Sequence, residues 1–199
     1  MLAAIVGSTL LIALIMWDWM QFTRLTAPSL RYGCRVARIE HRLPRMTLAT
    51  ALSRFDCHGL LALPSGMARC FEGGRQIALR PQYRLLSQRF RTAWPLKAAI
   101  ELHSEANETR LICTKLIPWS SALMTLLWFV VVGGGTIVFI VSFMAAGGLG
   151  SLAGVLTGLG VAGVGVLVLL FGLVVVSLAY RLEDQRLTQA CEELQAALS

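Results

Sequence analysis

Five basic side chains gather in a short stretch that also carries aromatic residues. The aromatic residues are Tyr83, Phe90 and Trp94, and the basic residues are Arg80, Arg84, Arg89, Arg91 and Lys97. Cations beside aromatic rings can bind phosphates, whether on lipid headgroups or on nucleic acid. The same residues also fit a solvated face whose charge only fixes orientation in a membrane. We expect contact with anionic lipid headgroups or a phosphate ligand. We expect no nucleic-acid partner, because no nucleic-acid-binding module is recognisable.

The tightest grouping of potentially reactive side chains is Asp56-Cys57-His58. Adjacent residues on a strand point to opposite faces, so Cys57 and His58 would not converge on one substrate or metal unless they sit in a loop. His41 and His103 give no ligand spacing. The sequence also shows no glycine-rich phosphate loop and no nucleophile motif. We therefore expect no catalytic residue, no metal and no cofactor.

Glycine is concentrated in the last long apolar stretch. Gly150, Gly154 and Gly158 are spaced four residues apart, which on a helix places them on one face where another backbone can approach closely. Two interpretations of this helix-packing set stay open. The face can pack against the preceding apolar segment, where residues 133–135 are all glycine, or it can dock another subunit.

These residues belong to a chain with the composition of a membrane protein. Of 199 residues, 56% are hydrophobic and only 15% are charged, whereas soluble domains have about 25% charged residues. The apolar residues predict a transmembrane anchor helix over 1–23 and a glycine-rich transmembrane hairpin over 119–180. A cleaved signal peptide is the alternative for the first segment. It is disfavoured because no basic residue precedes Arg24 and bulky residues, including Trp17 and Trp19, follow the apolar stretch.

The distribution of charge predicts the orientation of the chain in the membrane and argues against transport through the hairpin. Residues 119–180 contain no Asp, Glu, Lys, Arg or His, groups that ion and proton pathways usually need, so a channel, pump or transporter is not expected. Residues 24–118 hold sixteen of the eighteen basic residues against six acids, a net charge of +10. Basic segments stay inside, so we expect this domain and the C-terminus to be cytoplasmic and the N-terminus to be outside. Five cysteines without a CxxC pair fit reduced thiols.

The basic domain, residues 24–118, reads as mainly antiparallel β-structure. We predict a short helix over 47–55 and strands over 32–41, 60–63, 67–71, 76–80, 96–103 and 109–117. Glycines near residue 73 indicate a hairpin turn. The fold class is therefore an α+β membrane protein with three transmembrane helices and a small antiparallel β-rich cytoplasmic domain between the first and second. A pleckstrin-homology-like sheet is one form that this domain could take.

Residues 181–199 predict an amphipathic cytoplasmic helix. Its apolar stripe consists of Leu182, Leu187, Ala190, Cys191, Leu194 and Leu198. Such a stripe must be covered, either by the basic domain, whose charge is opposite, or by a partner.

Together these features favour a non-catalytic integral membrane accessory or scaffold subunit. It would sit in the lipid bilayer and dock to other membrane protein subunits through the glycine face and the basic domain. The alternative is a membrane-tethered sensor that binds a lipid or phosphate ligand through its basic cluster.

Overall fold

The computed structural model describes residues 2–44, 48–71, 75–82, 94–104 and 108–198. The chain forms two compact units. The first consists of Met1–Ser121 together with Arg181–Ser199, and the second of Ala122–Tyr180. Each unit is described by itself.

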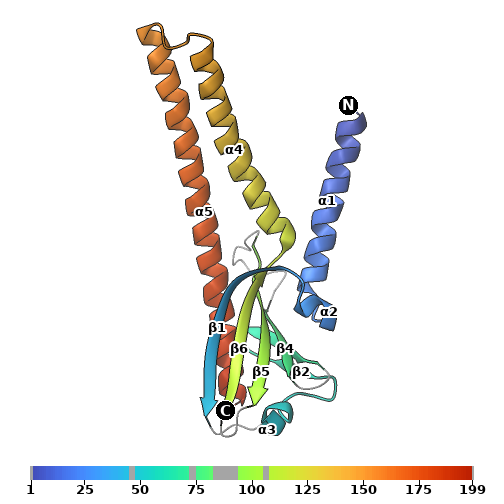
Figure 1. Ribbon diagram of the computed structural model, residues 1–199. Helices are drawn as coiled ribbons and strands as arrows, with labels where there is room; N and C mark the ends of the chain where they lie inside the picture. The colour runs from blue at the N-terminus through green and yellow to red at the C-terminus, as the bar shows by residue number, and fades with distance from the viewer. Residues whose placement is uncertain (1, 45–47, 72–74, 83–93, 105–107, 199) are drawn as a thin grey trace. The chain divides into compact units, whose positions relative to one another are not determined.

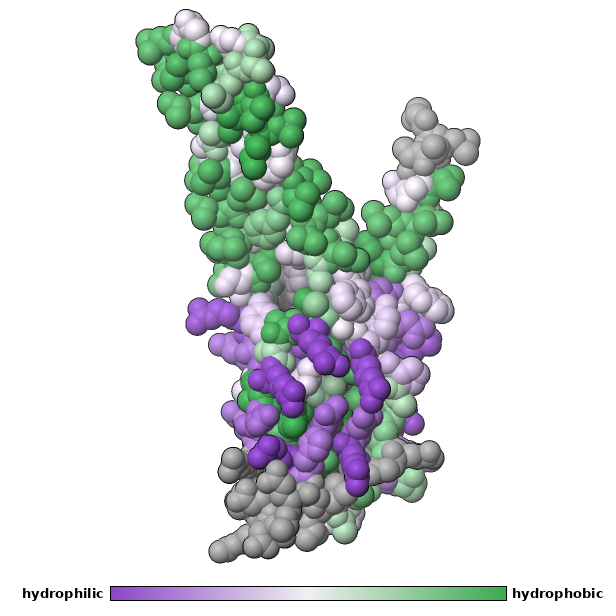
Figure 2. All heavy atoms as spheres, in the orientation of Figure 1, coloured by the Kyte–Doolittle hydropathy of each residue, from purple (hydrophilic) through white to green (hydrophobic). Residues whose placement is uncertain are grey.

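Three helices of the described chain are long and apolar enough to cross a membrane. They are α1 (Leu2–Thr23), α4 (Trp119–Ala145) and α5 (Leu152–Leu198), each in one of the stretches that the sequence predicts to be membrane-spanning (Figure 1). In α1, in α4 and in α5 as far as Tyr180, the outward side chains are almost all hydrophobic (Figure 2). The third span and the C-terminal tail form one continuous helix of 47 residues.

A short turn joins α4 to α5. Gly147 adopts a positive φ of 74°, which an L side chain rarely adopts. The N–H of Gly148 donates to the carbonyl of Phe143 at 2.9 Å, and the N–H of Gly150 donates to that of Gly147 at 3.0 Å. The turn therefore satisfies backbone groups at the end of α4 with its own atoms.

The first unit is built on a six-stranded antiparallel sheet, as the sequence predicts. The strand order is β1-β6-β5-β4-β3-β2. The strands are β1 (Cys34–Pro44), β2 (Leu60–Ala62), β3 (Gly66–Cys70), β4 (Gln76–Pro81), β5 (Lys97–Ser104) and β6 (Glu108–Ile117). Two short helices, α2 (Ala27–Leu30) and α3 (Leu48–Leu52), connect to β1 and β2.

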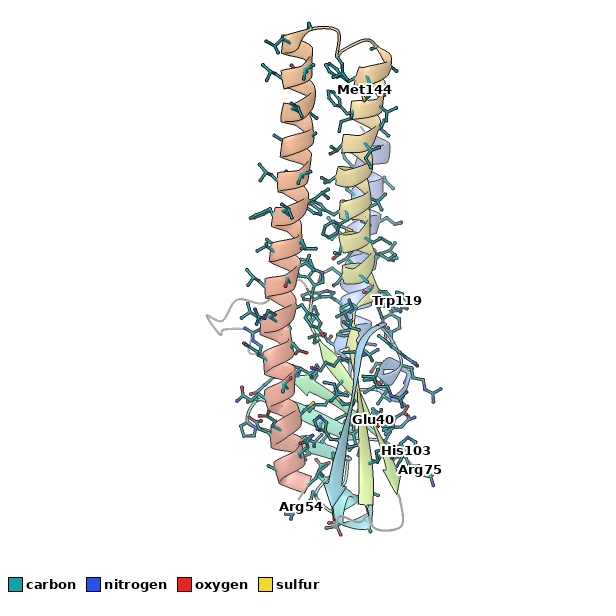
Figure 3. The ribbon with its side chains drawn as sticks, turned by 60° about the vertical axis from the view of Figure 1, so that its left-hand side comes forward. Glu40, Arg54, Arg75, His103, Trp119 and Met144 are labelled. Atoms are coloured by element: carbon teal, nitrogen blue, oxygen red, sulfur yellow. The ribbon has the colours of Figure 1, made fainter. Side chains whose placement is uncertain are left out.

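The two faces of this sheet are covered differently. On one face the C-terminal part of α5 packs over residues such as Cys113 and Gly66. On the other face Phe22 and Leu30, from α1 and α2, form a cluster with Ala78, Ala99 and Leu116. The remainder of that second face carries polar side chains, and Figure 3 places Glu40 and His103 on the side away from α5.

Candidate functional site

The helices of the second unit touch through glycines spaced seven residues apart. A Cβ added at Gly165 would lie 2.5 Å from the Thr136 side chain, and one at Gly172 would lie 2.1 Å from the Trp128 ring. At Gly158 the nearest atom, a ring carbon of α4, would lie at an ordinary 3.6 Å. Seven residues are about two helical turns, so these glycines follow one line along α5. Larger side chains of α4 therefore pack directly against the α5 backbone.

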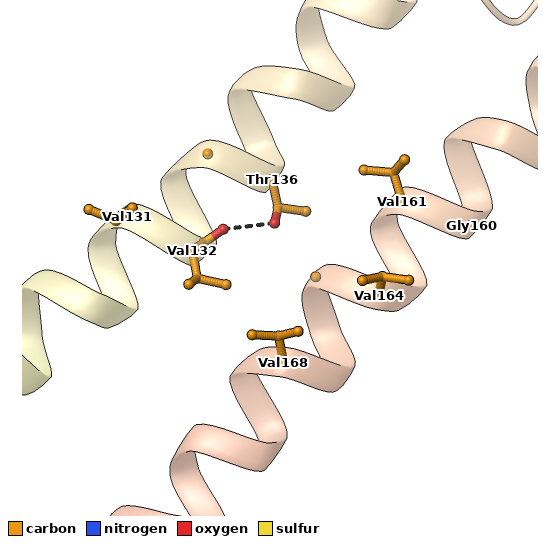
Figure 4. A pocket seen from close by; sticks show the side chains of 9 residues that line it. Val131, Val132, Thr136, Gly160, Val161, Val164 and Val168 are labelled. Atoms are coloured by element: carbon orange, nitrogen blue, oxygen red, sulfur yellow. Dashed lines mark hydrogen bonds between the residues drawn. The ribbon is translucent and has the colours of Figure 1, made fainter.

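Beside this contact, α4 and α5 leave an open groove of about 470 Å³ (Figure 4). Valines from both helices line it, together with Gly135, Thr136, Gly160 and Gly165. Of these lining residues, all within the described chain, Thr136 alone has a polar side chain, and its hydroxyl donates to the Val132 carbonyl at 2.7 Å. The groove therefore presents small apolar side chains and a hydroxyl that is already bonded.

Four other glycines in the helices of the hairpin are open to their surroundings. A Cβ added at Gly134, Gly135, Gly160 or Gly163 would meet no atom within 4 Å. Gly135 and Gly160 line the groove, while Gly134 and Gly163 do not. The glycines of this unit thus divide into those that pack inside the hairpin and those that leave space beside it.

The structure separates the three glycines of the predicted helix-packing set. Gly150 lies in the turn, before α5 begins at Leu152, so the three do not share one helix face. A Cβ at Gly154 would lie 1.7 Å from the Gly148 carbonyl oxygen, which places Gly154 against the turn. Gly158 alone of the three contacts α4. Their role in docking another subunit stays a prediction.

In the first unit, basic side chains of the sheet hold the end of α1. Arg80 donates to the Thr23 carbonyl, and Arg69 donates to the Leu25 carbonyl at 2.9 Å. The last turn of α1 has no basic residue of its own. Carbonyls at a helix C-terminus lack intrahelical partners and carry partial negative charge. The sheet therefore supplies the cations that this helix end lacks.

Lys97, inside the core, is a third basic side chain that donates to backbone carbonyls near the end of α1. Its residue is only 4% exposed, and its ammonium donates to the carbonyls of Ser29 and, at 3.4 Å, Phe22. The ammonium also lies 4.3 Å from the centre of the Phe22 ring. Burial lowers the pKa of Lys97 to about 8, and the charge of nearby Asp18 acts in the opposite direction.

Asp18 links α1 to the start of α4. This carboxylate is 7% exposed, accepts from the Tyr32 hydroxyl and accepts from the backbone N–H of Ser120 at 2.9 Å. The hydrogen bond to Asp18 raises the pKa of Tyr32 to about 12. A carboxylate at the first turn of a helix accepts from a free N–H and is attracted by the positive end of the helix dipole. Asp18 therefore caps α4 from a neighbouring helix.

The basic cluster singled out in the sequence is only partly visible. Arg84, Arg89 and Arg91 lie outside the described residues. Arg80 and Lys97 are described, and both donate to backbone carbonyls near the end of α1. The ammonium of Lys97 is therefore turned into the unit, away from any lipid or phosphate. Anionic contact by the remaining arginines stays a prediction.

The C-terminal tail lies against the sheet, which confirms one of the two interpretations of its apolar stripe. The exception is Leu182, which was predicted to belong to the stripe but is 48% exposed. Leu187, Ala190, Leu194 and Leu198 are all fully buried. Polar contacts flank them: Lys115 pairs with Asp184, and the Glu193 carboxylate accepts from the backbone N–H of Ser65 at 2.8 Å. The acidic tail and the basic domain thus meet through both apolar burial and opposite charges.

Two cysteines meet in this contact. The sulfur atoms of Cys113 and Cys191 are 3.7 Å apart, and both residues are buried. The hydrogen bond to Cys113, together with burial, raises the pKa of Cys191. Both thiols are buried in this contact and contribute to its packing.

The Asp56-Cys57-His58 group forms a turn. One oxygen of Asp56 accepts the backbone N–H groups of His58 at 2.9 Å and Leu60 at 2.6 Å. Such bonds are typical of Asp in turns. Cys57 and His58 are both exposed. The Asp56 carboxylate therefore stabilises local backbone.

Sequence reasoning missed several of the residues that position these sites. Asp18 was visible as the single acid in an otherwise apolar first segment, which is a signal for a specific partner. The seven-residue spacing of Gly158, Gly165 and Gly172 was also readable. The role of Arg69 had no local signal, because its partner lies 44 residues away.

A scan against protein-family models finds no match, and comparisons with the curated proteins and with the solved structures find none either. The geometry of the described residues therefore carries the functional argument.

Proposed function

We propose that this chain is a non-catalytic, multi-pass integral membrane protein that acts as an accessory or scaffold subunit. It holds an apolar transmembrane helix of a partner membrane protein in the open groove between α4 and α5. One observation carries this proposal. Gly135 and Gly160 line the groove from the two helices, and at each a Cβ would meet no atom within 4 Å.

The chemistry of the groove selects an apolar helix. In lipid, helices associate through close van der Waals packing, and small residues let two backbones approach each other. The lining valines and glycines provide such a surface, and the hydroxyl of Thr136 is already bonded within α4. A charged or strongly polar segment would find no partner there.

In this proposal the basic sheet and the C-terminal tail lie in the cytoplasm, since basic segments are retained inside. Cys57 is exposed, so its labelling shows on which side of the membrane the sheet lies. With Cys57 as the single cysteine, a membrane-impermeant maleimide should label it only after cells are permeabilised. Labelling in intact cells would overturn the orientation. A non-catalytic role rests on the lack of a recognisable catalytic motif, and a pleckstrin-homology-like sheet stays a hypothesis.

Co-purification with matched variants tests the docking proposal. The protein is extracted in a gentle detergent and analysed by size and mass spectrometry. The double substitution Gly135→Leu and Gly160→Leu should remove a stoichiometric partner, because leucine fills the groove. The control, Gly134→Leu and Gly163→Leu, changes two open glycines outside the groove and should keep the partner. A monomer without a partner before any substitution would contradict the proposal.

A second candidate function is a membrane-tethered sensor of a lipid or phosphate ligand. One observation favours it: among the described residues, the guanidinium groups of Arg31 and Arg35 have no hydrogen-bond or ion-pair partner. Binding of an anionic lipid, tested with and without these arginines, distinguishes this function from helix docking.

A further inference from the structure

The sheet face away from α5 contains a pocket of about 310 Å³ near the start of β1. Ala99, Leu116 and the half-buried Thr114 form its floor, and Arg31 and Arg35 stand exposed at its edge. Arg38 and Glu101 complete the edge. Figure 2 shows hydrophilic side chains gathered over this face of the sheet. The pocket therefore combines a small apolar floor with a basic rim.

A bulge in β1 brings two of these arginines to the same face. Arg35 is opposite Leu116 and Arg38 is opposite Thr114, while the register shifts between Arg35 and Ala37. In a regular strand, residues three apart point to opposite faces. The extra residue at the bulge cancels that alternation, so both arginines lie over the β6 residues that form the floor. Bulges that re-aim side chains in this way are frequent beside functional sites.

The arginines of the pocket have weak partners or none within the described chain. Among the residues that the structure describes, no hydrogen bond or ion pair involves the side chain of Arg31 or Arg35. Arg38 lies 3.9 Å from Glu40, with both side chains more than half exposed, and such pairs are weak. The acid at the edge, Glu101, lies 3.7 Å from His103. The pocket lining therefore has three guanidinium groups and one carboxylate, and Glu40 beside Arg38 is a second carboxylate nearby.

Guanidinium groups bind phosphate through two parallel charge-assisted hydrogen bonds. The location of the pocket indicates where that phosphate comes from. Arg31 follows shortly after the end of α1, and Leu116 lies just before α4 begins. Asp18 joins these two helix ends by accepting the Ser120 N–H. Both helices are long and apolar enough to cross a membrane, so the pocket lies next to the points where the chain would enter lipid.

We infer that this pocket binds the phosphate group of an anionic phospholipid in the leaflet that α1 and α4 enter. The inference rests on the proposed membrane location but not on docking in the groove. It places lipid binding at Arg31, Arg35 and Arg38, separate from the cluster around Arg80.

Native mass spectrometry of the full chain in a mild detergent tests this site. The protein is titrated with phosphatidylglycerol and, separately, with phosphatidylcholine. The substitutions Arg35→Gln and Arg38→Gln should weaken phosphatidylglycerol binding about tenfold, the effect of losing charge-assisted hydrogen bonds. The matched control, Arg54→Gln and Arg75→Gln, removes the same charge from two exposed arginines elsewhere in the unit (Figure 3). It should change binding less than about twofold.

Each outcome decides the proposal. Equal loss in both double variants would mean diffuse attraction, and no loss in either would mean no site at β1; both results overturn the inference. Displacement of the lipid by millimolar inorganic phosphate would assign the site to a soluble anion and overturn the lipid assignment. If the β1 variant does not fold, Arg31→Gln in the exposed cap of α2 should weaken binding in the same direction. The groove variant Gly135→Leu and Gly160→Leu should keep lipid binding, so failure of helix docking is distinguishable.

Discussion

The two halves of α5 are held by different physical means. From Leu152 to Tyr180 the helix meets α4 through glycines, with ring and methyl groups of α4 packed directly on its backbone. From Arg181 onward the same helix buries leucines against the sheet and adds ion pairs such as Lys115 with Asp184. One continuous helix thus changes its packing chemistry at the boundary between the two units.

This difference follows from the surroundings that each half requires. In lipid, burying a leucine gains little, because lipid tails are as apolar as the leucine, so close approach of small residues drives contact. In water, each buried leucine stabilises by about 1.5–3 kcal/mol, and charges can stay at the edge. The change in α5 therefore marks where the helix leaves the proposed membrane.

The largest expected effect is in the water-facing half. Leu194 is fully buried against the sheet, so Leu194→Ala should reduce the free energy of unfolding of the first unit by about 2–5 kcal/mol. Leu182 lies on the same helix and is 48% exposed. Leu182→Ala is therefore the matched control and should change stability by less than about 0.5 kcal/mol. Thermal unfolding in detergent measures both variants, and equal losses would contradict the packing of the tail.

The next effect comes from the buried lysine of the first unit. The pKa of Lys97 is about 8 in the folded chain, below its ordinary value of 10.5. Between these values Lys97 binds more protons in the unfolded chain, so raising the pH from 8 to 9 should stabilise the unit by about 1 kcal/mol. Above pH 9 the raised pKa of Cys191 opposes this gain. Above pH 10 the trend should reverse, because folding raises the pKa of Tyr32 to about 12.

Unfolding measured across this pH range should show the slope in the native chain and lose it in Lys97→Met. Comparing slopes separates the titration of Lys97 from any general loss of stability in the variant. A slope that persists in Lys97→Met would assign the effect to another group.

In the membrane half of α5 we expect a smaller change in stability, and one that differs strongly between two glycines. A Cβ at Gly172 would overlap the Trp128 ring, so Gly172→Leu should destabilise the hairpin by about 1–3 kcal/mol. Gly163 is on the same helix with no atom within 4 Å, and Gly163→Leu should be neutral. Intrinsic fluorescence during thermal denaturation in detergent follows both. If Gly163→Leu destabilises the hairpin as much as Gly172→Leu, close packing at particular glycines does not hold the membrane half of α5.

Local patterns were sufficient to predict most elements of the fold. Alternating apolar residues and the glycines near residue 73 indicated the strands, and uninterrupted apolar runs indicated the three long helices. These signals are local, because strand and helix periodicity depend on neighbouring residues. The bulge between Arg35 and Ala37 had no such signal, since it appears only in the pairing with β6.

The candidate sites were harder to predict, because charge and composition do not say which way a side chain points. Lys97 counted as one more basic residue, yet it is buried and bonded to backbone of Phe22 and Ser29. The four-residue spacing predicted that Gly150 and Gly154 share a helix face with Gly158. Gly150 cannot lie on that face, because the helix begins only at Leu152. Which glycines pack and which stay open depends on the partner helix, and a single sequence does not contain that information.

The most direct test of the account is photo-crosslinking in native membranes. A photoreactive amino acid replaces Gly160, which lines the groove, or Gly163, which is equally open but lies outside it. If a partner helix lies in the groove, position 160 should give one discrete protein adduct and position 163 none. Adducts of the same protein from both positions, or only lipid adducts from position 160, would contradict the claim that the groove between α4 and α5 holds a partner helix.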